Sequence, residues 1–147
     1  MGSRRAAREL ALQALYQVDL QGGGDAEPPS LALFWEHFDP AADPETRAFA
    51  RELVDGVRES QERIDGLIAN AAEHWRLPRL SRVDLNVLRL ATFELIARPE
   101  IPATVTLNEA VEIARRFGSE ESASFVNGVL DHIARQAGLP GLSPGSA

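Results

Sequence analysis

The stretch from Thr106 to Asp131, TLNEAVEIARRFGSEESASFVNGVLD, restricts the possible folds most, because it predicts two helices joined by one tight turn. Its apolar residues recur at intervals of three and four, which places them on one face of each helix. Thr106 and Glu109 have the spacing of a capping box, so we expect the first helix to begin there. Gly118 is expected to end that helix as a left-handed residue, and Ser119 is expected to cap the second helix.

The second helix contains residues with more specific expectations. Glu121 falls in its first turn, where the positive end of the helix dipole favours negative charge. Gly128 lies in the helix interior, where glycine costs about 1 kcal/mol relative to alanine, so we expect another backbone to pass close to it. The pattern does not decide whether Phe125 is buried or exposed. The helical spacing favours a core position, whereas an exposed ring would be able to stack on an RNA base.

The rest of the chain also predicts helices and no convincing strand. These helices are expected over residues 6–20, 44–57, 64–75 and 82–98. The last of them follows an N-cap at Ser81 and is apolar around most of its circumference, so we expect it to lie at the centre of the fold. A short aromatic helix or turn is expected at residues 31–38. The pattern leaves open whether the chain bends within residues 56–61.

The chain has 147 residues, which is enough to bury a core of its own. We therefore expect one all-α domain of six or seven helices over residues 1–140, followed by a flexible tail at 141–147. Pro78 discourages helix just before it, so the domain is expected to consist of an N-terminal half, 1–78, and a C-terminal half, 79–140.

Composition and motifs argue against several classes of function. The chain has 22 acidic residues and 15 basic residues, all arginine, and its net charge of −7 argues against a general polyanion binder. Cysteine is absent, and neither a membrane span nor a secretory signal is recognised, so we expect a cytoplasmic protein. The three histidines are far apart in sequence, and no nucleophile and base pair or phosphate-binding glycine loop is found. We therefore expect no metal, no cofactor and no enzymatic activity.

Arginines mark the start of the first helix. Arg4, Arg5 and Arg8 fall within its first two turns, and the first acidic residue of the chain is Glu9. A helix N-terminus carries free amide donors and partial positive charge, so arginines at this place form a compact phosphate-binding site. The alternative is that these arginines are merely solvated, which composition alone favours.

With these residues assembled, the chain resembles the NusB family of bacterial transcription antitermination factors along nearly its whole length. The resemblance rests on RRAARELALQALYQ at residues 4–17, DLNVLRLATFEL at 84–95 and LNEAVEIARRFGSEESASFVNGVLD at 107–131. The last block is the most specific, because it joins NEA, the FG turn, a serine and FVNGVLD at the spacing of the family.

The resemblance implies two roughly perpendicular three-helix bundles and an RNA-binding role without enzymatic activity. It implies binding of the single-stranded boxA element of nascent ribosomal RNA leaders together with NusE, a small-subunit ribosomal protein. It further implies assembly on RNA polymerase with other Nus factors, which suppresses premature Rho-dependent termination. By position, the residues expected to contact RNA are Arg4, Arg5, Arg8, Glu121 and Phe125, and those expected to contact NusE are Tyr16 and Asp84.

Other classes of protein remain as alternatives. One is the RNA-binding domain that precedes the methyltransferase in ribosomal RNA cytosine methylases, against which the end of the chain at Ala147 speaks. Another is a helical protein-interaction module whose arginines are solvated. The sequence leaves open whether the protein is a monomer or a homodimer.

Overall fold

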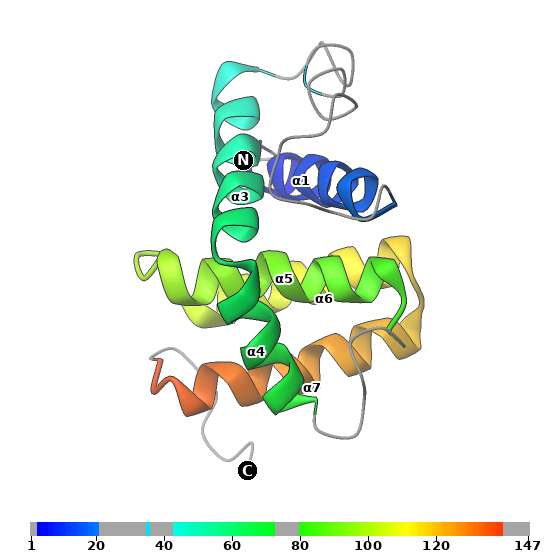
Figure 1. The fold of residues 1–147 in the computed structure, drawn as a ribbon, viewed down its shortest axis with the longest axis vertical. Coiled ribbons are helices and arrows are strands. Elements are labelled where there is room, and N and C mark those ends of the chain that lie inside the picture. Colours follow the sequence, from blue (N-terminus) through cyan, green and yellow to red (C-terminus); the bar gives the residue numbers. More distant parts are fainter. Residues whose placement is uncertain (1–2, 21–34, 36–42, 73–79, 140–147) are drawn as a thin grey trace.

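A computed structural model describes residues 3–20, Trp35, 43–72 and 80–139 of the chain. Within these residues the fold is all-α, as the sequence predicts, with six helices and no strand (Figure 1). The helices are α1 (Ser3–Leu20), α3 (Pro44–Glu59), α4 (Gln61–Ala71), α5 (Arg82–Ala97), α6 (Ala103–Phe117) and α7 (Glu120–Gln136). Of the predicted aromatic segment at 31–38 only Trp35 is described, and it is buried; the predicted tail at 141–147 lies outside the described residues.

Several helix starts follow from local sequence alone. Ser81 caps α5, since its hydroxyl accepts a hydrogen bond from the backbone N–H of Asp84 at 3.0 Å. Ser119 caps α7 in the same way, by accepting from the N–H of Ser122 at 3.1 Å. Each cap satisfies one of the N–H groups that have no partner inside the helix. Both predicted caps are therefore confirmed, and Pro44 begins α3 as expected.

The helix at the centre of the fold is α5, as its apolar circumference predicts. It contacts each of the other five described helices, and Leu88 near its middle is fully buried. Around it α1 packs against α3, and α6 packs against α7; α1 lies above α5 and α7 below it in the view of Figure 1. Because both pairs of helices also pack on α5, its apolar side chains are buried against each of the two pairs.

The chain bends between α3 and α4, where Ser60 alone separates the two helices. This settles the question that the sequence left open at residues 56–61. Beyond the bend, α4 packs against α5 and α7. The predicted half 1–78 includes α4, so the last described helix of that half lies beside helices of the half 79–140. The division of the chain at residue 78 stays a prediction.

The predicted start of α6 is wrong. The helix begins at Ala103 with Pro102 at the N-cap, because the fixed backbone angle of proline suits entry into a helix. Thr106 lies inside the helix, only 1% exposed, and its hydroxyl has no hydrogen-bond partner among the described residues. Glu109 does not complete a capping box, because its carboxylate pairs with Arg5 of α1.

Both predictions about glycines are also wrong. Gly118 ends α6 with φ of −119°, which is not a left-handed conformation. A Cβ at this position would lie 2.6 Å from the hydroxyl oxygen of Ser122, so lack of space explains the glycine. Gly128 is exposed, and a Cβ there would meet nothing within 4 Å. The close approach occurs instead at Gly56 of α3, where a Cβ would collide with the ring of Phe93 in α5.

Candidate functional site

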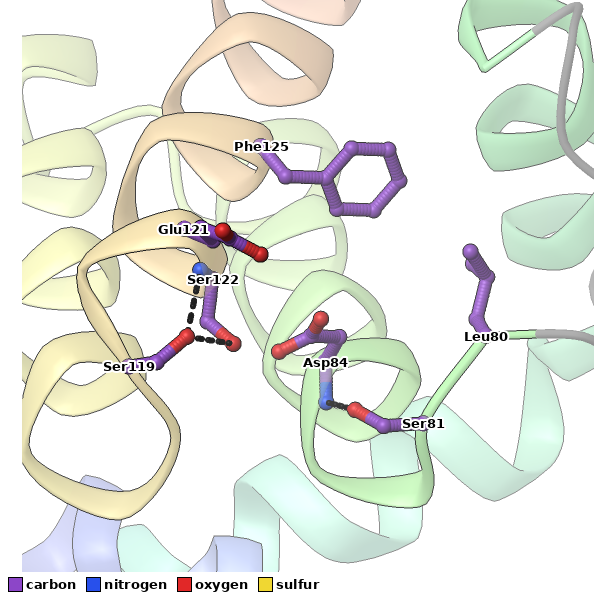
Figure 2. A pocket seen from close by; sticks show the side chains of 7 residues that line it. All are labelled: Leu80, Ser81, Asp84, Ser119, Glu121, Ser122 and Phe125. Carbon is purple, nitrogen blue, oxygen red and sulfur yellow. Dashed lines mark hydrogen bonds between the residues drawn. The ribbon is translucent and has the colours of Figure 1, made fainter.

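A surface pocket of about 300 Å³ lies between the first turns of α5 and α7 (Figure 2). The N-caps of these helices, Ser81 and Ser119, both line it, so two helix N-termini border one cavity. The partial positive charge of these helix ends favours the carboxylates of Asp84 and Glu121 in their first turns. The complete lining consists of Leu80, Ser81, Asp84, Ser119, Glu121, Ser122 and Phe125.

Phe125 is half-buried, so neither of the two positions considered for it applies alone. Part of its ring packs against the hydrophobic core, and part borders the pocket, into which Figure 2 shows it projecting from α7. The carboxylate of Asp84 also points into the pocket, and one of its oxygens is enclosed without a hydrogen-bond partner among the described residues. The pocket thus combines an aromatic ring with hydroxyl and carboxylate groups, which suits a planar ligand that carries hydrogen-bond donors.

The three predicted arginines of α1 occupy different environments. Arg5 is exposed and makes a bidentate ion pair with Glu109, with nitrogen to oxygen distances of 3.0 and 2.6 Å. Arg8 is buried, only 4% exposed, and pairs with Glu94 of α5 at 2.8 and 2.7 Å. A phosphate ligand requires an exposed guanidinium, which Arg8 does not offer. Arg8 instead joins α1 to the centre of the fold.

Glu109 links the exposed arginine to the buried one. It lies 3.7 Å from Arg8 as well as in hydrogen-bond contact with Arg5. The hydrogen bond from Arg5, followed by the charges of Arg5 and Arg8, holds the pKa of Glu109 below its ordinary value, although burial opposes this. The same hydrogen bond raises the pKa of Arg5. The start of α1 is therefore electrostatically attached to α6.

Arg4 lies against α3. Its guanidinium carbon is 4.5 Å from the ring centroid of Phe49 in α3, a cation–π arrangement. Arg98, at the end of α5, approaches the same ring at 5.3 Å. Arg4 is exposed and lines a second pocket of about 310 Å³, to which Glu45 and Glu52 also contribute.

Tyr16 is half-buried near the end of α1 and does not line the pocket between α5 and α7. One turn further along α1, the backbone carbonyl of Asp19 accepts a hydrogen bond from Arg82, the first residue of α5, at 3.0 Å. The end of α1 therefore lies against the first turn of α5, which also carries Asp84. The residues predicted to contact NusE are thus found at the two sides of one helix junction.

The described residues contain no group of three or more histidine, cysteine, aspartate or glutamate side chains able to hold a metal ion. None of the helices in the described ranges is long and apolar enough to cross a membrane.

Sequence reasoning misses the polar groups that complete the site. It gives Ser122 no role, and it treats Ser81 and Ser119 only as caps, yet all three line the pocket. A partial signal is present, because two predicted caps mark two helix ends with free N–H groups. That these ends meet depends on how α7 packs against α5, which no local pattern encodes.

These features define a class: an all-α protein with a central helix and a polar, aromatic-edged surface site built from helix ends. The chain belongs to the NusB family, whose family model matches residues 5–135.

Known proteins resemble the chain over most of its length. Transcription antitermination protein NusB of Sorangium cellulosum (strain So ce56) is 51% identical over 138 residues, which cover 94% of this chain and 96% of that protein. Among solved structures, T. maritima NusB matches with a TM-score of 0.80 and 42% identity over 90% of this chain and 91% of its own. A chain in a crystal structure of antitermination factors NusB and NusE in complex with dsRNA matches with a TM-score of 0.79 and 30% identity, over 92% of this chain and 98% of its own.

Proposed function

We propose that this protein is a transcription antitermination factor that binds the boxA RNA of nascent ribosomal RNA leaders together with NusE. In this role it joins other Nus factors on RNA polymerase, in the cytoplasm, and suppresses premature Rho-dependent termination without catalysing a reaction. The observation that carries the proposal is the 51% identity to an antitermination protein across 94% of the chain. The similarity to a NusB chain crystallised with NusE and dsRNA supports NusE and RNA as ligands.

The site suggests how the ligands are divided among its residues. Arg4 and Arg5 are the exposed predicted arginines, so they supply the phosphate contacts, which position RNA without reading its sequence. Phe125 stacks one base at the pocket between α5 and α7, beside Glu121. Tyr16 and Asp84 face NusE near the junction of α1 and α5. Arg8 acts indirectly, because its ion pair with Glu94 holds the start of α1 in place.

Net charge fits this division of labour. A chain with a net charge of −7 repels polyanions in general, so RNA has to be bound where arginines gather and an aromatic ring is available. The methyltransferase alternative gains no support from the matches, which cover 96% of a relative named as an antitermination protein.

Fluorescence anisotropy tests the proposal. Labelled boxA RNA and a scrambled RNA of equal length are titrated with the protein, with and without NusE, across a salt series. We expect preference for boxA that increases with NusE. The double variant Arg4→Ala/Arg5→Ala should have a salt slope smaller by about 0.7 for each phosphate that the arginines no longer neutralise. Phe125→Ala should weaken binding about fivefold or more, because the ring no longer stacks on a base.

Arg63→Ala is the control for removal of an exposed arginine outside the proposed site, because Arg63 is exposed on α4 and lines neither the pocket of Phe125 nor that of Arg4. Equal binding of boxA and scrambled RNA in the presence of NusE would contradict the proposed function. The helical protein-interaction module would then be the better description.

A further inference from the structure

Arg116 and Phe117 end α6 and form an exposed pair of a kind that binds RNA. The side chain of Arg116 is 65% exposed, and Phe117 is 38% exposed, although most large apolar side chains of the described fold are covered. The guanidinium carbon of Arg116 lies 5.3 Å from the ring centroid of Phe117. An arginine held over an exposed ring offers a charge for a phosphate next to a flat surface for a base.

Arg116 and Phe117 lie between the two parts of the proposed RNA surface, which are the arginines at the start of α1 and the pocket of Phe125. Toward the start of α6, Glu109 binds Arg5, and it precedes Arg116 by about 10 Å along the helix. In the other direction only Gly118 separates Phe117 from Ser119, which lines the pocket of Phe125. A strand of RNA that runs from the start of α1 to Phe125 therefore has the end of α6 along its path.

Arg116 also differs from Arg115 in the number of carboxylates that pair with it. Arg115 is bound by two glutamates, Glu112 and Glu120, from its own helix and the next. Among the described residues, Arg116 has one ion-pair partner, Glu9 of α1, at 2.6 Å. A phosphate that approaches Arg116 competes with this carboxylate, and the exposed guanidinium has enough donors for both.

We propose that Arg116 and Phe117 form a third RNA contact, in which Arg116 binds one phosphate and Phe117 packs against the adjacent base. Glu9 is the counter-ion of Arg116 in the RNA-free protein and weakens RNA binding by competing for the guanidinium. The inference rests on the proposed function, because it places a further contact along the same RNA. It adds the end of α6, which no part of the predicted site includes.

The alternative is that Arg116 only joins α6 to α1 through Glu9. The two explanations predict opposite effects of Glu9→Gln. If Arg116 binds a phosphate, Arg116→Ala weakens boxA binding about five- to tenfold and lowers the salt slope by about 0.7, whereas Glu9→Gln strengthens binding about two- to fivefold. If the pair only joins the helices, both variants change RNA binding in the same direction or leave it unchanged.

Anisotropy titrations of labelled boxA RNA with NusE present decide between them. Arg116→Lys should keep the salt slope, because it keeps the charge, and Phe117→Ala should weaken binding about fivefold with the slope unchanged. Thermal melting followed by circular dichroism checks that each variant is folded, and Arg63→Ala is again the control.

Arg116→Ala and Glu9→Gln binding curves that coincide with that of the control, while the unchanged protein still prefers boxA, would overturn this inference alone. Absence of boxA preference in the unchanged protein would overturn the proposed function itself.

Discussion

Arg8 and Glu94 form an ion pair whose side chains are only 5% and 2% exposed. Removal of one partner leaves an unpaired charge in the interior, which costs about 3–5 kcal/mol. We expect Arg8→Met and Glu94→Leu each to lower the free energy of unfolding by about that amount, and the double variant to recover most of the loss. Urea unfolding followed by circular dichroism measures all three. Losses that simply add in the double variant would contradict this account.

Glu109 makes a pH-dependent contribution to stability. Its pKa is lowered in the folded protein by Arg5, so its contribution is present above the ordinary glutamate pKa of about 4.3 and is lost as the pH falls through the lowered value. We expect Glu109→Gln to lower the melting temperature at pH 7 and this difference to shrink below about pH 4.3. Calorimetric melts between neutral and acidic pH test it. Glu62→Gln, at an exposed position of α4, is the control for removal of a carboxylate.

At the scale of single helices, replacement by alanine should have opposite effects on stability at two glycines. Gly128 lies exposed inside α7 with nothing within 4 Å of a Cβ, so Gly128→Ala should stabilise the protein by about 1 kcal/mol. At Gly118 a Cβ would lie 2.6 Å from the hydroxyl of Ser122, so Gly118→Ala should be destabilising. Melting temperatures of the two variants test the pair. A destabilising Gly128→Ala would show that this helix face is covered after all.

The existence of the six described helices and the starts of α3, α5 and α7 could be predicted from sequence, because they depend on neighbours within one turn. Ser81 and Ser119 cap the helices that follow them, as their positions predict. The predicted helix start at Thr106 is wrong because it depends on a residue that is distant in sequence. The spacing of Thr106 and Glu109 matches a local motif, but Glu109 binds Arg5, 104 residues away in sequence. A partner so distant leaves no trace in the local pattern.

The candidate site could be predicted from the sequence less completely than the fold. The prediction of Phe125 as an RNA contact depends on a family resemblance, as does that of Glu121, since the helical pattern alone favours a buried ring. Exposure of the arginines also depends on packing, because Arg8 pairs with Glu94 in the buried face of α5, whereas Arg5 pairs with Glu109 at the surface. Which arginine is buried follows from the face of α1 that packs against α5, and no spacing within residues 4–17 specifies it.

At the scale of the whole molecule, α5 should be the last helix to lose its structure. It contacts all five other described helices, so its backbone amides become accessible only when both groups of helices separate. We expect the amides of Leu88 and its neighbours to exchange hydrogen at the rate set by global unfolding. Amides near the end of α1 should exchange faster. Native-state hydrogen exchange by mass spectrometry or NMR tests this, and rapid exchange in α5 would contradict it.

The pocket of Figure 2 has a thermodynamic consequence for the proposed function. Asp84, assigned to the protein partner, and Phe125, assigned to RNA, line the same 300 Å³ cavity. Two ligands that meet there alter each other's binding free energy, and the factor by which NusE changes the affinity for RNA must equal the factor by which RNA changes the affinity for NusE. A single substitution at the shared pocket can therefore change the cooperativity of assembly while each separate affinity is preserved.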